Sequence, residues 1–253
     1  MTQWIIVMDV ETTGLEAHDR VCEVAAVPVV GDPPVHVVGR GVTSLVNPGI
    51  PIPPQASAIH HLVDEDVQGA PTLAEALDQC FDGMEGGDDE APILAAHNAP
   101  FDRGMLPPLK DFQWIDTYRC SLHLWPEAPS HSNQALRYWR GVKVRGDRGE
   151  GGWLRHSMPH SALFDAYTTA ALLVEMLKER TPEDLLRLSE TPVLLHTCRL
   201  PAHKGKPWSE VPYGYLRWAA GQRDPGWDAD TQHTIEHHLE RIKATPAIRG
   251  ERG

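Results

Sequence analysis

A short apolar run near the N-terminus, Trp4 to Val10, predicts a buried strand that carries two carboxylates at its far end. Alternate side chains of a strand point to the same side, so Asp9 and Glu11 share one side. Like charges this close repel each other, and both ionise readily only with a cation between them. Oxygen ligands alone favour Mg²⁺ or Mn²⁺ over Zn²⁺. The alternative is an acidic strand end that caps a loop, with Gly14 turning the chain.

Length and composition exclude several classes of protein. The chain has 253 residues, enough for one large domain or one domain with an appendage, and an apolar share of 41% excludes wholesale disorder. No run approaches the ~20 apolar residues that span a bilayer, and the N-terminus does not resemble a signal peptide. We therefore expect no membrane partner. Four widely separated cysteines predict reduced thiols in a cytoplasmic protein and neither a disulfide scaffold nor a thiolate zinc site: Cys22, Cys80, Cys120 and Cys198.

The net charge of −12 argues against a nucleic-acid-binding surface over the whole chain, although a local basic patch suffices for phosphate contacts. The stretch Arg137 to Arg155 holds six bases and two acids. One reading is that it steers a DNA backbone toward an acidic metal site. The other is a solvated, exposed loop.

The expected elements alternate in type along the chain. Two more strands, a helix, a strand and three helical segments follow the first strand: Val21–Val30, Val35–Val46, Thr72–Phe81, Pro92–Ala96, Phe101–Leu106, Gln134–Trp139 and His160–Arg180. This order predicts an α/β fold with a mixed central sheet. From about Pro192 to Leu239 the composition becomes rich in Trp, Pro and Gly, which predicts a small appended module. Its aromatic residues either form the core of that module or, with nearby Lys and Arg, bind nucleic acid by stacking and charge.

Two later segments place a carboxylate near a helix start. His97-Asn98-Ala99-Pro100-Phe101-Asp102 follows a short apolar strand, and His160-Ser161-Ala162-Leu163-Phe164-Asp165 leads into the longest helix. Taken alone, each reads as an ordinary acid at a helix N-terminus, stabilised by the helix dipole.

In order and spacing, D-x-E-T-T-G, H-N-A-x-F-D and H-x-x-x-x-D together resemble the motifs of the DEDDh (DnaQ-like) family of 3′–5′ exonucleases. Residues Ala58 to Val67 resemble a further segment of that family, with Val63 where Thr is usual. The resemblance covers about residues 4 to 178. It implies a ribonuclease H-like fold, in which helices flank a mixed central sheet.

The resemblance also implies roles for individual residues. Asp9, Glu11, Asp102 and Asp165 would be catalytic, metal-binding carboxylates, and His160 would be the general base. Two Mg²⁺ ions ~3.5–4 Å apart, with Mn²⁺ as a substitute, would activate water and stabilise the leaving 3′-oxygen. A histidine with an ordinary pKa of ~6.5 suits proton removal near neutrality.

Six residues are expected to bind substrate: Thr12, Thr13, Gly14, Leu15, Asn98 and His60. The first three either present backbone N–H groups to the terminal nucleotide or simply form a turn. Leu15 would wedge against terminal bases. Asn98 either orients substrate or braces the Asp102 loop, and His60 alternatively is an ordinary loop histidine.

The C-terminal part of the sequence indicates one branch of the exonuclease family. Residues Gly205 to Val211 and Tyr215 to Trp218 resemble the G-K-P … Y-L-R-W region of the exodeoxyribonuclease X branch, although Leu200 to His203 depart from its pattern. This predicts an exonuclease domain over residues 1–180 and a branch-specific module over residues 192–243. We thus expect an exodeoxyribonuclease that releases nucleoside 5′-monophosphates from single- or double-stranded DNA 3′ ends, in DNA repair, and a homodimer is compatible with it.

Three other functions remain open. The chain could be a proofreading subunit like the polymerase III epsilon subunit, an RNA 3′-trimming enzyme like RNase T, or a non-catalytic nucleic-acid-binding scaffold. The intact set of four carboxylates and one histidine weighs against the scaffold.

Overall fold

The computed structural model describes residues 4–31, 35–82, 84, 91–144, 158–222 and 226–244. Contacts divide the chain into two compact units, Met1–Ser189 and Glu190–Gly253. The assignment of residues 1–180 as an exonuclease domain and 192–243 as a branch-specific module stays a prediction. No helix within the described ranges is long and apolar enough to cross a membrane.

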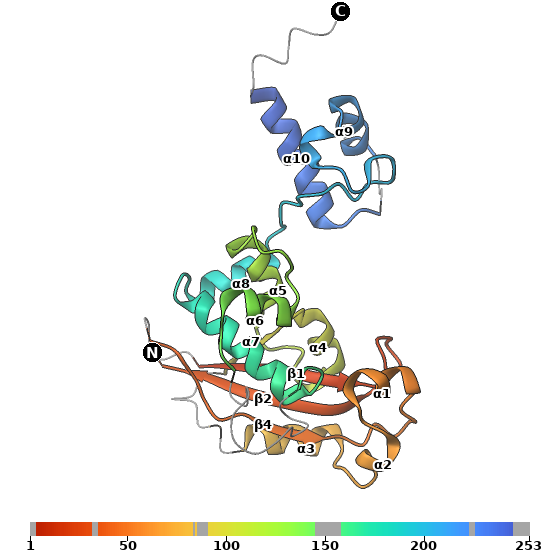
Figure 1. Ribbon diagram of the computed structural model, residues 1–253, viewed down its shortest axis with the longest axis vertical. Coiled ribbons are helices and arrows are strands. Elements are labelled where there is room, and N and C mark those ends of the chain that lie inside the picture. Colours follow the sequence, from red (N-terminus) through yellow and green to blue (C-terminus); the bar gives the residue numbers. More distant parts are fainter. Residues whose placement is uncertain are drawn as a thin grey trace, which may run out of the picture. The chain divides into compact units, whose positions relative to one another are not determined.

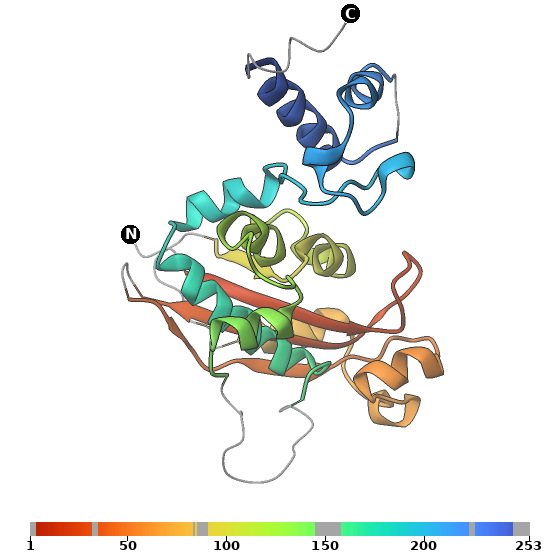
Figure 2. The same cartoon turned by 45° about the horizontal axis from the view of Figure 1, so that its top comes forward.

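The first unit is built on a mixed sheet of six described strands (Figures 1 and 2). Strand β1 lies at its centre, antiparallel to β2 and parallel to β5, and β5 is parallel to β6. The outer strands β3 and β4 both pair with β2 in the antiparallel sense. The strands are β1 (Ile5–Thr12), β2 (Val21–Val30), β3 (Val37–Val38), β4 (Val42–Leu45), β5 (Ile93–Ala96) and β6 (Trp114–Asp116).

Helices cover both faces of this sheet, and Figure 1 shows α7 and α3 on opposite sides of it. In β1, Ile5 and Val7 belong to the core cluster shared with α7, whereas Ile6 and Met8 belong to the cluster shared with α3. The helices of the unit are α1 (Pro54–His60), α2 (Asp64–Val67), α3 (Leu73–Phe81), α4 (Ala99–Met105), η1 (Pro107–Leu109), α5 (Thr117–Leu124), α6 (Asn133–Arg140), α7 (Ala162–Leu177) and α8 (Pro182–Glu190). Because side chains alternate along a strand, this division sets the direction of the motif carboxylates.

Local signals explain where several helices begin and end. Thr72 and Glu75 form a capping box at the start of α3, in which each side chain accepts a hydrogen bond from the other's backbone N–H. Gly141, in the left-handed conformation, ends α6. The predicted helix over His160–Arg180 is shorter in the structure, because His160 adopts a positive φ and Ser161 is the N-cap residue.

The predicted single strand Val35–Val46 is wrong. The structure has two short strands here, because Gly39 and Gly41 press against β2 where no side chain fits. A Cβ on Gly39 would lie 2.9 Å from the Pro28 ring, and one on Gly41 would lie 2.6 Å from Val27. Gly41 instead donates its N–H to the Tyr167 hydroxyl of α7 at 2.7 Å.

The second unit has its own small core. Helices α9 (Tyr213–Ala220) and α10 (Ala229–Ala244) pack together, with η3 (Pro201–His203) and η4 (Trp208–Glu210) beside them. Trp208 and Leu216 are buried at its centre. Side chains of α10 bind the backbone of the segment that begins this unit. The Asp230 carboxylate accepts the N–H of Val193 at 2.8 Å, and the Thr234 hydroxyl accepts the N–H of Leu195 at 3.0 Å.

Candidate active site

Strand β1 directs Asp9 and Glu11 to the face of the sheet covered by α7. Both residues continue the alternation of Ile5 and Val7, which pack against that helix. Glu11 lies directly opposite Glu23 of β2, and the pairing register shifts at the next position, between Glu11 and Thr12. A register shift of this kind re-aims side chains at the end of a strand, and here it sits beside the motif.

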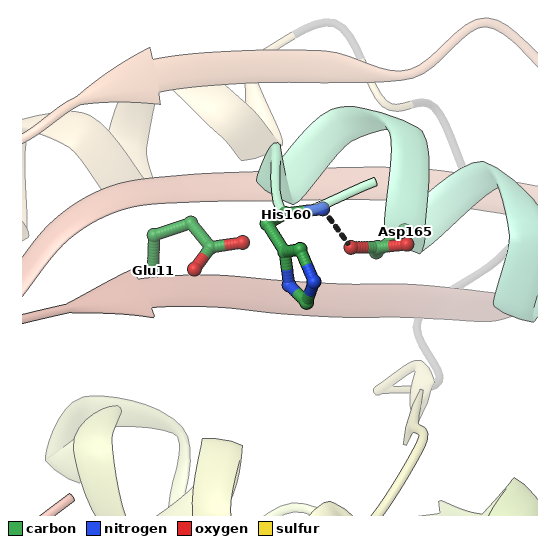
Figure 3. Close-up of side chains that lie close together, drawn as sticks. All are labelled: Glu11, His160 and Asp165. Carbon is green, nitrogen blue, oxygen red and sulfur yellow. Dashed lines mark hydrogen bonds between the residues drawn. The ribbon is translucent and has the colours of Figure 1, made fainter. Parts of the chain in front are cut away.

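The start of α7 brings His160 and Asp165 to Glu11. Their ligand atoms all lie within 4.8 Å of one another. Figure 3 shows the His160 side chain beside Glu11 from β1, with Asp165 on the helix. The backbone N–H of His160, not its ring, donates to the Asp165 carboxylate at 2.7 Å. His160 has a φ of 64°, an unusual conformation for a residue other than glycine, and its side chain is exposed.

Helix α4 brings the fourth motif carboxylate, Asp102, which is buried. The helix begins at Asn98, whose φ of 76° lies in the left-handed region that Asn tolerates best after Gly. The Asp116 carboxylate fixes this turn by accepting the N–H of Asn98 at 3.1 Å. The same oxygen also accepts the N–H groups of Tyr118 and Arg119 at the start of α5.

Like charge and burial dominate the electrostatics. Burial raises the pKa of Asp9 well above its ordinary value, and the charges of Asp102, Asp165 and Glu11 raise it further. Burial raises the pKa of Asp102 to about 8, against hydrogen bonds from the backbone of Asp102 itself and Val10. Burial also raises the pKa of Asp165. The four motif carboxylates thus form a set whose charges a divalent cation would relieve, although Asp9 and Asp102 lie outside the closest group.

Sequence reasoning missed the side chains that hold Asp165. Gln134 of α6 donates its Nε2 to Asp165 Oδ1 at 2.7 Å, and Arg137 donates to Gln134 Oε1 at 3.2 Å. Asn133 donates to the backbone carbonyl of Asp165 at 3.3 Å. The available signal was that Gln134 opens the predicted helix Gln134–Trp139, with polar Asn133 immediately before it. Arg137, which was predicted within a basic exposed stretch, is 3% exposed, whereas residues 145–155 of that stretch lie outside the described residues.

Sequence reasoning also missed Glu23. Its carboxylate is 1% exposed and accepts the N–H of Ala162, the first residue of α7, at 3.1 Å. Thr43 of β4 lies 3.5 Å from the other carboxylate oxygen. Glu23 therefore ties β2 to the helix that carries Asp165.

The turn after β1 is held by its own threonines. The Thr12 hydroxyl donates to the carbonyl of Gly14 at 2.6 Å, and the Thr13 hydroxyl donates to Asp19 at 2.9 Å. The N–H of Thr13 donates to the Arg20 carbonyl, so this group serves the turn. A Cβ on Gly14 would lie 2.4 Å from the Asp19 carboxylate, which explains the glycine.

Leu15 extends from this turn with 81% of its surface exposed. It lines a pocket of about 730 Å³ together with Val21, Phe101 and Met105. This pocket adjoins the motif turn, and the motif carboxylates are not among its lining residues. Its apolar rim can contact a base.

The prediction that His60 binds substrate is wrong. Its ring is 2% exposed, Nδ1 accepts the N–H of Leu62 at 3.0 Å, and Nε2 lies 3.8 Å from the Cys22 sulfur. His60 is a core residue at the end of α1. Asn98, by contrast, is exposed, and its backbone braces the Asp102 helix.

Comparisons with known proteins identify the family. The sequence model of the RNase_T exonuclease family matches residues 6–173, about two thirds of the chain. The chain belongs to this exonuclease family. It is 33% identical to Exodeoxyribonuclease 10 of Escherichia coli K12 over 239 residues, which are 92% of this chain and 98% of that protein. It is 32% identical to a DNA polymerase III subunit epsilon-like protein of Rhodobacter capsulatus over 181 residues, which are 68% of this chain and 23% of that protein.

Solved structures agree with this assignment. The exonuclease resembles Exonuclease X in complex with 5′ overhanging duplex DNA, with a TM-score of 0.58 and 30% identity over 73% of this chain and 99% of that one. It also shares its fold with the nuclease domain of 3′hExo, a DEDDh family member, at a TM-score of 0.53 and 18% identity over 70% of this chain and 93% of that one. The predicted family, fold class and enzyme class are confirmed.

The residues of this exonuclease fit the metal on which its family depends. Carboxylate oxygens from Asp9, Glu11, Asp102 and Asp165 are hard ligands of the kind that Mg²⁺ and Mn²⁺ prefer. The raised pKa values of Asp9, Asp102 and Asp165 mark a surplus of negative charge that a bound cation would compensate.

Proposed function

We propose that this exonuclease degrades DNA from the 3′ end and releases nucleoside 5′-monophosphates, using two Mg²⁺ ions, and that it acts in DNA repair in the cytoplasm. One observation carries the proposal: β1, α4 and the start of α7 converge with carboxylates, and His160 lies beside two of them. The four buried, free cysteines support a reducing compartment. Homodimer formation stays a prediction.

In this proposal the four carboxylates of Asp9, Glu11, Asp102 and Asp165 hold the ions. When bound, the ions neutralise the phosphodiester and lower the barrier to attack by water. His160 takes the proton of the attacking water on an imidazole nitrogen, because its ring is exposed and lies beside the acidic group. Gln134 and the His160 backbone keep the Asp165 carboxylate in one orientation.

The choice of DNA rests on the relatives. Exodeoxyribonuclease 10 matches 92% of the chain, so the match extends into the second unit, whereas the epsilon-like protein matches 68%. This difference favours a stand-alone exodeoxyribonuclease over a proofreading subunit. Leu15 and the apolar pocket beside it support contact with a terminal base.

A gel time course tests the proposal. Single-stranded DNA, duplex DNA and RNA of one sequence, each labelled at the 5′ end, are incubated with Mg²⁺ or with EDTA. We expect a Mg²⁺-dependent ladder that shortens DNA from the 3′ end, lost in Asp9→Asn and kept in Asp78→Asn, an exposed acid on α3. A ladder on RNA alone would assign the enzyme to RNA trimming, and no ladder on any substrate would refute the proposal.

A further inference from the structure

Four rings of the second unit form a row in which each ring contacts the next. The ring centroids of His203 and Tyr215 lie 4.6 Å apart, those of Tyr215 and Trp218 lie 5.1 Å apart, and those of Trp218 and Trp227 lie 6.4 Å apart. Trp218 is 52% exposed, whereas Trp208 is 2% exposed and fills the core. The core therefore uses Trp208 and leaves the middle of the row open to solvent.

The row is held on a fixed support. Tyr215 and Trp218 are one turn apart on α9, so their rings lie on the same side of the helix. Leu216, between them in sequence, is fully buried and anchors the opposite side. Little side-chain freedom remains to be lost when a flat ligand stacks on these rings.

Basic side chains flank the row. A turn closed by hydrogen bonds between Cys198 and both Gly205 and Lys206, at 2.8 and 2.7 Å, presents exposed Lys204 and Lys206 immediately after His203. Gly205, with a φ of 84°, allows this turn. At the other end of the row, Arg199 neutralises Asp228, the neighbour of Trp227, at 3.0 Å.

Charge divides unevenly between the two units. Residues 190–253 carry nine Lys and Arg against eight Asp and Glu, whereas residues 1–189 carry 14 against 27. The second unit thus lacks the strong negative charge of the first. An anionic polymer meets less repulsion there.

We propose that the row His203–Tyr215–Trp218–Trp227, with Lys204 and Lys206, is a binding site for single-stranded nucleic acid, whose bases stack on Trp218 and its neighbours. Every base has a π-face, and lysines supply phosphate contacts without reading sequence. Duplex bases are already stacked on each other and do not offer these faces. Lysine is depleted in protein interfaces, so the flanking lysines favour this ligand over a protein partner. The choice of DNA as the strand rests on the proposed function.

Binding is tested on the full chain in EDTA, where hydrolysis cannot proceed. Fluorescence anisotropy follows a labelled oligothymidylate of about 20 nucleotides, longer than the roughly 4–16 that single-strand sites cover. We expect Trp218→Ala and Trp218→Leu to raise the Kd about tenfold or more, and Trp218→Phe to keep most of the affinity, because only Phe can stack. Leu194→Ala, which removes an exposed apolar side chain of the same unit outside the row, should leave the Kd unchanged.

A second arm tests the lysines. Both lysines lie on an exposed turn, so they can be replaced together. The double variant Lys204→Ala with Lys206→Ala should flatten the slope of log Kd against log salt concentration by about 0.7 for each lost phosphate contact. Thermal melting confirms that each variant folds. A Kd for Trp218→Ala within twofold of the unchanged chain, full affinity in Trp218→Leu, or no binding of any single strand would overturn the site.

Hydrolysis of the p-nitrophenyl ester of thymidine 5′-monophosphate separates this inference from the proposed function. This substrate carries a single nucleotide and offers the row no single strand to bind, so Trp218→Ala should hydrolyse it at the normal rate while Asp9→Asn does not. If the unchanged chain does not hydrolyse the ester but still binds single strands in a way that depends on Trp218, the proposed function alone is refuted. Normal hydrolysis with binding that is indifferent to Trp218 would refute the site alone.

Discussion

Gln134 and His160 share the two oxygens of the Asp165 carboxylate. The Gln134 amide donates to Oδ1 and the His160 backbone donates to Oδ2, both at 2.7 Å. Arg137, buried against the Phe164 ring with its guanidinium 5.1 Å from the ring centroid, donates in turn to Gln134. Hydrogen bonds of this kind orient metal-binding carboxylates and tune their affinity.

Replacing Gln134 should therefore weaken metal activation. In Gln134→Leu the side-chain volume is nearly kept but the hydrogen bond to Asp165 is lost, and we expect a 10- to 100-fold rise in the Mg²⁺ concentration for half-maximal rate, on the order of other such partners. A Mg²⁺ titration of the initial rate measures it. The same change at exposed Gln68 is the control, and an unaltered titration in Gln134→Leu would contradict the orienting role.

Replacing His160 tests proton transfer by itself. Asn tolerates the positive φ and keeps the backbone N–H to Asp165, so His160→Asn removes the imidazole alone. We expect kcat to fall by roughly 10²–10⁴ with little change in KM or in metal affinity. His61→Asn is matched, because His61 is also exposed and has a φ of 62°. Full kcat in His160→Asn would assign the proton to another group.

At the scale of elements, Glu23 fixes the start of α7 to the sheet. Its carboxylate accepts the N–H of Ala162, a group at the helix N-terminus that lacks a partner within the helix. Glu23→Ala should lower the free energy of unfolding by about 1–3 kcal/mol, and Glu23→Gln by less, because an amide oxygen still accepts. Urea denaturation in EDTA measures both, with exposed Glu65→Ala as a control expected within about 0.5 kcal/mol. Equal losses in the two Glu23 variants would assign the effect to charge.

Elements with a strong local pattern were predictable. The apolar runs of β1 and β2 and the helical period of α7 carry their own signal, and β2 begins and ends at the predicted residues. The break between β3 and β4 could not be predicted from the sequence, because it depends on the close approach of Gly39 and Gly41 to Pro28 and Val27 of β2. Such contacts between neighbouring strands cannot be predicted from the hydrophobic pattern of the segment 35–46 itself.

The residues of the candidate site likewise divide into those that the sequence predicts and those that it does not. The proximity of Glu11, His160 and Asp165 was predictable because the resemblance of the motifs assigns them to one site, and the roles of the motif residues stay predictions. Glu23 and Gln134 were not predictable, since each acts on a residue that lies 139 or 31 positions away along the chain. His60 was misassigned because the motif-like segment around it contains a core position, and only burial distinguishes the two roles.

At the scale of the whole molecule, the acidic site destabilises the metal-free fold. The pKa of Asp9 is raised, and that of Asp102 is raised to about 8, so the folded state favours their protonated forms. The stability that these groups contribute is full below their ordinary pKa values and is lost as pH rises through the raised ones. The metal-free protein should thus lose stability between about pH 5 and pH 8 through these groups.

Thermal melting of Asp9→Asn checks this. In EDTA at pH 8 the variant should melt above the unchanged chain, and the difference should shrink as the pH falls toward 5. Excess Mg²⁺ should reverse the order, because a ligand at 100 times its Kd stabilises by about 2.7 kcal/mol and the variant has lost one of the four site carboxylates. An unchanged melting temperature in Asp78→Asn is the control. A variant that melts below the unchanged chain in EDTA at pH 8 would contradict this account.

The hydrogen bond between position 160 and Asp165 runs through the main chain, so its survival does not depend on which amino acid is encoded there. Any residue other than proline can supply that N–H, and asparagine or glycine would also accept the backbone angle. One codon change at position 160 would therefore keep the four acids and this hydrogen bond and, in the proposed function, remove the proton acceptor alone. The architecture thus separates the geometry of the acids from the proton chemistry, since position 160 orders Asp165 through its main chain and takes part in catalysis, in the proposed function, only through its side chain.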